Sequence, residues 1–178
     1  MKRYLIVSVL IVISSVLMAG CSGSDKEDSL PFYPSLSDYD YESSLTAFVY
    51  EPVADEEEYG IQYREVTDME KLLSSDFPVL IYFHSSLSPD TNGITAGAED
   101  IAQCTWGNCL VIMADVLEEN DLANRFGVEK VPEFVLVRSG NEISSFQGYN
   151  YEVWTMSDVA SWVSGQGIRV DYSKIDQE

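Results

Sequence analysis

Apolar and polar residues follow two different periods between residues 61 and 164, and these periods predict the secondary structure. Alternation with a period of two is typical of a half-buried strand, and a short continuous apolar run is typical of a fully buried one. A spacing of three or four residues is typical of a helix. The patterns predict strands at 61–66, 79–83, 110–114, 134–137 and 143–146, and helices at 68–74, 94–103, 120–126 and 156–164.

Capping and turn signals support these elements. Glu70 follows Thr67 at the spacing of a capping box, so we expect Thr67 to be the N-cap of the first helix. Gly127 is placed to end the third helix, and the run 139–141 (Ser-Gly-Asn) is typical of a hairpin turn. Strands and helices therefore alternate until a closing hairpin and a last helix. This order predicts an α/β layer fold with a mixed sheet.

Residues 1–20 have the composition of a targeting segment. Two basic residues precede an almost wholly apolar stretch at 4–16, and the small residues Ala19 and Gly20 then lead to Cys21. This pattern resembles the signal peptide of bacterial lipoproteins, which implies cleavage before Cys21 and a lipid on its thiol. A plain secretory signal and an uncleaved anchor helix are the alternatives. We expect an extracytoplasmic protein, held by the lipid on the cell membrane or the outer membrane.

Composition divides the rest of the chain into three parts. Residues 21–59 are acidic and polar, and we expect a partly disordered tether and accessory segment there. Within it, the apolar run 45–50 has the pattern of a strand or of a segment that docks on the domain. Residues 60–168 hold the predicted α/β domain, and residues 169–178 form a C-terminal tail.

The charge of the chain narrows the range of partners. The 178 residues include 30 acidic and 10 basic side chains, which gives a formal net charge of −20 at pH 7. Such a surface repels phosphates, so we expect no nucleic-acid partner. The acidic runs lack the spacing of a calcium loop, and the one histidine, His84, has no evident companions for zinc. We therefore predict no metal site and no other cofactor.

The order of elements resembles the thioredoxin fold, a three-layer α/β/α sandwich, over about residues 61–167. Residues 78–83 are similar to the central strand that leads into the family's active-site turn. Residues 114–128 are similar to its next strand, the short helix after it and the glycine that closes that helix. Val131 and Pro132 stand where the family carries its cis-proline, which implies a cis bond between them.

The active-site turn departs from this resemblance. The family has Cys-x-x-Cys at the head of the second helix, where this chain carries no sulfur and has Ser88-Pro89-Asp90-Thr91. Thiol–disulfide exchange needs a thiolate that attacks a sulfur, and a serine hydroxyl cannot replace it. Leu87 stands in place of the aromatic residue before the motif, and Tyr82 in place of a buried carboxylate. We therefore predict no catalytic residue at this turn.

The hydroxyl groups of the turn have two other possible roles. Ser88 would need an adjacent base to act as a nucleophile, and His84 is within reach, but the sequence offers no evident third group. A hydroxyl that caps the following helix is the simpler role for Ser88 or Thr91.

Cys104 and Cys109 are the remaining sulfur pair. They bracket a short loop between a predicted helix and a buried strand. In an oxidising compartment such a pair predicts a structural disulfide, worth about 2 kcal/mol by the chain-entropy estimate. The alternative is a displaced redox pair, although neither cysteine lies at a helix N-terminus that would lower its pKa.

These features predict a membrane-tethered, redox-inactive thioredoxin-like module. The resemblance implies a groove lined by Leu87, Val131 and Pro132, in which an exported protein or peptide would bind in extended form. The alternative function is a membrane-attached thiol–disulfide oxidoreductase that uses Cys104 and Cys109. A spacer without a ligand is a third possibility.

Overall fold

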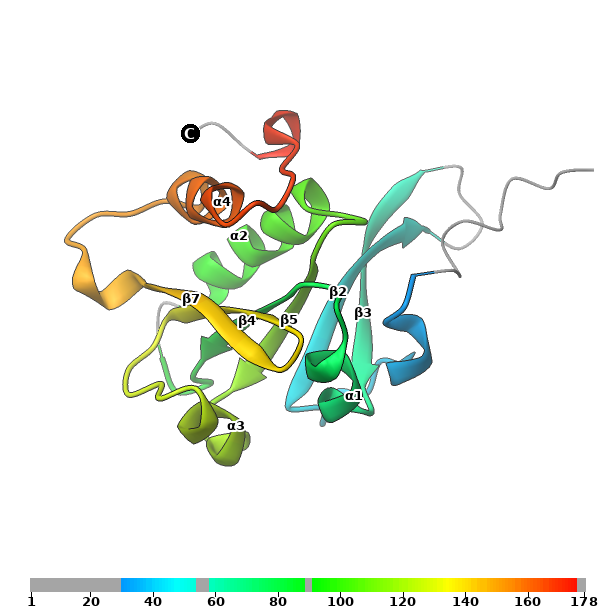
Figure 1. The fold of residues 1–178 in the computed structure, drawn as a ribbon, viewed down its shortest axis with the longest axis horizontal. Coiled ribbons are helices and arrows are strands. Elements are labelled where there is room, and N and C mark those ends of the chain that lie inside the picture. The colour runs from blue at the N-terminus through cyan, green and yellow to red at the C-terminus, as the bar shows by residue number, and fades with distance from the viewer. Residues whose placement is uncertain (1–29, 54–57, 89–90, 176–178) are drawn as a thin grey trace, which may run out of the picture.

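A computed structural model describes residues 30–53, 58–88 and 91–175, which form a sheet with helices on both faces (Figure 1). The strands are β1 (Leu36–Asp38), β2 (Leu45–Pro52), β3 (Tyr59–Val66), β4 (Val79–His84), β5 (Leu110–Asp115), β6 (Glu133–Arg138) and β7 (Asn141–Gln147). The helices are α1 (Met69–Ser74), α2 (Thr91–Cys104), α3 (Asn120–Arg125) and α4 (Met156–Gly165). Three short 3-10 helices are η1 (Tyr33–Ser35), η2 (Gly148–Asn150) and η3 (Tyr172–Lys174).

The seven strands form one mixed sheet in the order β1-β3-β2-β5-β4-β6-β7. β4 and β5 run parallel, and the other neighbouring strands are antiparallel. In this register His84 lies beside Asp115 of β5, and Phe83 lies beside Glu133 of β6. The carboxyl ends of β4 and β5 therefore meet the amino end of β6 at one edge of the sheet.

Helices cover the sheet in two layers. α2 and α4 lie on one face, and α1 and α3 lie on the other (Figure 1). Tyr82 and Val159 belong to the core beneath α2 and α4, whereas Ile81, Leu72 and Leu122 belong to the core beneath α1 and α3. Successive residues of a strand point to opposite faces, so burial on both sides explains the continuous apolar run of β4. The predicted α/β/α sandwich with a mixed sheet is confirmed.

Segments on both sides of the predicted domain take part in this fold. Residues 30–52, which composition assigned to the tether and accessory segment, supply η1, β1 and β2. Phe48 of β2 is buried, and its backbone lies between Tyr63 of β3 and Val111 of β5. At the other end, Ile175 in the expected tail is buried in the core beneath α2 and α4. Short apolar runs inside acidic segments thus decide what folds onto the sheet.

Two helices begin at other residues than predicted. The N-cap of α1 is Asp68, whose carboxylate accepts the Lys71 N–H at 3.0 Å. Thr67 instead binds η1, because its N–H and its hydroxyl both donate to the Ser35 carbonyl, at 2.9 and 3.0 Å. α2 begins at Thr91, three residues before the predicted start.

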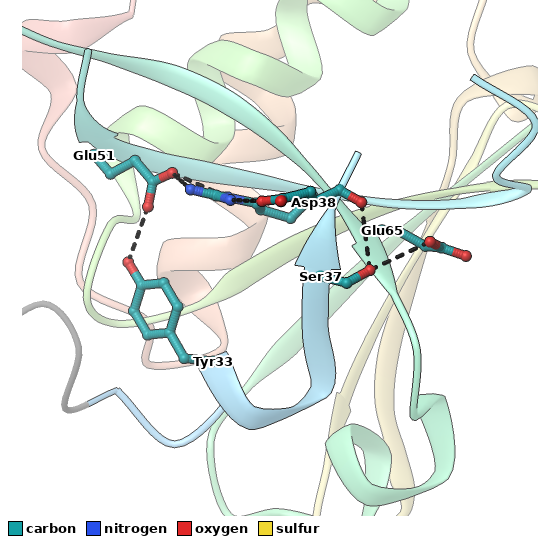
Figure 2. Close-up of polar contacts among 6 residues, drawn as sticks. Tyr33, Ser37, Asp38, Glu51 and Glu65 are labelled. Carbon is teal, nitrogen blue, oxygen red and sulfur yellow. Dashed lines mark hydrogen bonds and ion pairs between the residues drawn. The ribbon is translucent and has the colours of Figure 1, made fainter. Parts of the chain in front are cut away.

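A polar network joins the N-terminal strands to the rest of the sheet (Figure 2). Arg64 of β3 donates from Nε to the Glu51 carboxylate of β2 at 3.0 Å, and from Nη1 to Asp38 of β1 at 2.8 Å. The Tyr33 hydroxyl donates to the other oxygen of Glu51 at 3.5 Å. Each half-exposed pair contributes little alone, at most about 1 kcal/mol, but one guanidinium links three strands.

Candidate functional site

The turn after β4 is fixed to the end of β5. The Ser86 N–H donates to Oδ2 of Asp115 at 3.3 Å, and the Val116 N–H donates to the His84 carbonyl at 2.9 Å. The carboxylate of Asp115 also accepts the Leu117 N–H at 3.0 Å. Asp115 is therefore a backbone anchor for two turns at once.

This turn carries the residues that replace the redox motif. The Ser88 N–H donates to the Ser85 carbonyl at 2.9 Å, which places Ser88 just before the helix α2. Leu87 is 80% exposed and stands out from the turn. Pro89 and Asp90 lie outside the described residues, as does the side chain of Thr91, so their predicted roles stay predictions.

Val131 and Pro132 lie on the other side of β4. The peptide bond between them is cis, at the place that the resemblance implies. The next residue, Glu133, pairs with Phe83, so the proline borders the same end of β4 as Leu87. Glu133 is buried, and its carboxylate accepts the Tyr149 hydroxyl at 3.2 Å. The structure thus brings the three predicted groove residues to one edge of the sheet.

His84 and Asp115 set the electrostatics of this edge. Burial lowers the pKa of His84 below its ordinary value, and the charge of Asp115 opposes this only in part, so the imidazole is neutral at pH 7. Burial by itself would raise the pKa of Asp115, but hydrogen bonds from Leu117 and Ser86 and the nearby His84 hold that pKa below its ordinary value. Asp115 is therefore a carboxylate at neutral pH.

The buried Tyr82 offers no titratable group at neutral pH. It is 1% exposed, and its ring stacks on Phe134 with the ring centroids 5.0 Å apart. Burial raises the pKa of its hydroxyl to about 12. A group that keeps its proton throughout the physiological range cannot serve as a proton acceptor for a thiol.

The structure departs from the predicted disulfide: Cys104 and Cys109 are free, buried thiols. The two side chains make separate hydrogen bonds, Cys104 to the Ile101 carbonyl at 3.3 Å and Cys109 to the Leu110 carbonyl at 3.7 Å. Burial raises the pKa of each thiol to about 12. Thiolates are the reactive form, so both residues are poor nucleophiles in the folded protein.

One group of residues at this edge of the sheet was not predicted from the sequence. A pocket of about 550 Å³ is lined by His84 and Asp115 on one side and by Tyr39, Tyr41 and Glu42 on the other. The second group lies within residues 21–59, for which composition predicts a partly disordered tether and accessory segment. Aromatic residues in an otherwise polar run were the available signal, since a plain linker has few of them.

The expected membrane attachment falls outside the described residues, because Cys21 and residues 1–20 are not among them. Within the described ranges, no helix is long and apolar enough to cross a membrane. In the same ranges, no three His, Cys, Asp or Glu side chains are grouped so that they could hold a metal ion.

The chain is similar to a family model, to a plant protein and to solved structures of thioredoxins. A family model for thioredoxin matches residues 62–160. Thioredoxin H4 of Arabidopsis thaliana is 29% identical over 84 residues, which are 47% of this chain and 71% of that protein. A solved thioredoxin of Malassezia sympodialis has 19% identity and a TM-score of 0.48. The aligned region covers 55% of this chain and 84% of that thioredoxin. A mutant thioredoxin of Halobacterium salinarum has 21% identity and a TM-score of 0.49. The aligned region covers 59% of this chain and 88% of that thioredoxin.

The family match covers more than half of the chain. It begins in β3 and ends in α4, so it includes the turn after β4 and the Val131–Pro132 bond, and it leaves out β1 and β2. The chain belongs to the thioredoxin family.

Proposed function

We propose that this chain is a membrane-tethered member of the thioredoxin family that binds an extended segment of an exported protein and does not exchange disulfides. The observation that carries the proposal is the hydroxyl-bearing turn before α2, at Ser88, in a chain whose two remaining domain cysteines are buried. The tether is the lipid expected on Cys21.

The chemistry of the turn supports the absence of exchange. A mixed disulfide forms only when a thiolate attacks a sulfur, and a serine offers neither the charge nor the sulfur. Cys104 and Cys109 cannot substitute, because thiols with a pKa of about 12 are almost wholly protonated at pH 7. Without a thiolate the turn cannot exchange disulfides, but its surface can still bind a partner.

That surface suits a peptide. Leu87 is 80% exposed on one side of the end of β4, and Val131 and Pro132 border the other side. An exposed leucine beside the end of a strand gives an apolar contact next to backbone groups, which is the combination that recognises extended peptides. The ligand would lie across the end of β4.

A crosslinking experiment tests this proposal. A photoreactive amino acid replaces Leu87 in the full chain, and membranes are irradiated. The matched control carries the same group at Ile143, which is also exposed (39%) but lies on β7 away from this edge. We expect a discrete protein adduct from position 87 alone, which excess unlabelled protein suppresses.

Two outcomes would overturn the proposal. Equal amounts of adduct from both positions, or no adduct from position 87, would show that the surface around Leu87 does not bind a partner. Acceleration of insulin reduction by the purified protein, lost in Cys104→Ser, would instead establish the oxidoreductase.

A further inference from the structure

The pocket of about 550 Å³ beside β4 has a fixed outer wall. The Asp115 N–H donates to the Ser44 carbonyl at 3.2 Å, and the Ser44 hydroxyl donates to the Glu119 carboxylate. Ser44, at the end of the segment 39–44, is therefore held both to the end of β5 and to Glu119. A pocket whose walls are already held together loses little entropy when a ligand enters.

The charge of the pocket is negative. Glu42 lines it from one segment and Asp115 and Glu118 from another, and none of the described residues that line it is a lysine or an arginine. His84 is neutral at pH 7, so it does not offset the carboxylates. Asp115 is buried, where its field is less screened by water than that of a surface carboxylate. The pocket attracts a cation.

Tyrosine rings form the rim. Tyr39 and Tyr41 meet edge to face with their ring centroids 5.5 Å apart, and Tyr39 meets Tyr63 of β3 at the same distance. Tyr41 is 92% exposed. An exposed tyrosine offers a negative ring face to a cation, and tyrosine is enriched where proteins bind partners.

We propose that this pocket seats an arginine side chain of the bound protein, an assignment that rests on the proposed function. A guanidinium is planar, donates five N–H groups in a fixed fork and stacks on aromatic rings. It can therefore contact carboxylates on two segments while its plane lies on a tyrosine. A lysine ammonium is a compact point charge that uses fewer of these features at once.

The pocket and the groove can hold one ligand together. Asp115 and Pro132 border the end of β4 from opposite sides, so they are separated by about two strand spacings, roughly 10 Å. An extended chain covers that distance in about three residues. The arginine is therefore expected two to four residues from the segment that lies beside Pro132.

Binding of a short peptide to the full-length protein in detergent tests the pocket without the partner. The probe is the blocked tripeptide Ala-Arg-Ala, and the control is the same peptide with citrulline, which has the same shape without the charge. NMR signals of the Tyr41 ring and the His84 imidazole report occupancy. We expect saturable shifts with the arginine peptide and about tenfold weaker binding of the citrulline peptide.

Charge-matched variants separate the pocket from the overall charge. The double variant Glu42→Gln/Glu118→Gln is expected to weaken the arginine peptide about tenfold, because it removes two pocket carboxylates that are exposed and not needed for folding. The variant Glu142→Gln/Glu152→Gln removes the same charge elsewhere on the surface and should leave binding unchanged.

The outcomes distinguish the two proposals. Equal binding of both peptides, or equal loss in both double variants, would overturn the arginine pocket even if position 87 captures a protein. Selective arginine binding with no capture at position 87 would leave the pocket in place and overturn the groove.

Discussion

Position 104 and position 109 hold sulfur atoms in surroundings that suppress their chemistry. Both thiols are buried in the core beneath α2 and α4, and burial is the main reason that their pKa values rise to about 12. The residue type alone would indicate redox chemistry. The environment at each position decides otherwise.

Alkylation of a Cys21→Ser protein measures this suppression, because only the two buried thiols remain. We expect iodoacetamide at pH 8 to react about three orders of magnitude more slowly in the native protein than in urea, since a rise in pKa from about 8.5 to about 12 removes most of the thiolate. Mass spectrometry follows the reaction.

The same experiment reports on the predicted disulfide. A chain that stays unmodified in urea until a reductant is added would contain that bond. Fast reaction of the native protein would show that one thiol is accessible.

The sequence predicts individual residues of the site unevenly. Leu87, Ser88 and Pro132 were predictable because each stands at a fixed offset from a strand or a turn. Asp115 and Tyr41 were not, since 74 residues separate them in the chain and only the antiparallel pairing of β2 with β5 brings their segments together. Long-range pairing has no local signature.

The helix α2 illustrates how an element depends on its neighbours. It contains Gly93 and Gly97, which lower its intrinsic helix propensity. A Cβ at Gly97 would lie 2.2 Å from Cγ of Met156 in α4, whereas a Cβ at Gly93 would meet nothing within 4 Å. The close contact between α2 and α4 therefore requires glycine at position 97 but not at position 93.

Alanine at these two positions should therefore have opposite effects. We expect Gly97→Ala to lower the free energy of unfolding by about 1–3 kcal/mol through overpacking. Gly93→Ala should raise it by roughly 0.5 kcal/mol through helix propensity. Urea titrations of both variants measure the difference.

Gly93→Ala is the matched control for Gly97→Ala. Adding Met156→Ala should relieve most of the overpacking in Gly97→Ala. A loss that persists after this change would mean that another contact needs the glycine.

Most elements followed from the sequence, and those that did not have physical reasons. The strands from β3 to β7 have apolar patterns long enough to identify. β1 is three residues long and η1 lies in a polar segment, so neither has a period to detect. The apolar run 45–50 has the pattern of a strand or of a docking segment in spite of its acidic surroundings, and it forms part of β2.

At the scale of the whole molecule, the acidic surface and the expected lipid have opposite effects on membrane binding. The formal charge of −20 on the whole chain favours solubility and repels anionic membrane surfaces. The attachment expected at Cys21 would therefore depend on the hydrophobic burial of acyl chains, and two chains hold a protein far more firmly than one.

Mass spectrometry of the N-terminal peptide checks this attachment. We expect a mature chain that begins at Cys21 and carries a diacylglyceryl group, and a Cys21→Ser protein that lacks the lipid mass. Detergent, but not high salt, should release the wild-type protein from membranes because acyl chains are held by hydrophobic burial. An unmodified Cys21 in a cleaved chain would contradict the lipoprotein assignment.

The strand β2 fills the space between β3 and β5, so the region that matches the family is not self-sufficient. A chain cut at residue 62 would leave Val111 and its neighbours in β5 without the backbone partners that Thr46 to Phe48 supply. Bare strand edges recruit other chains. The segment that forms β2 therefore also shields this strand edge, and we expect a protein that lacks it to aggregate.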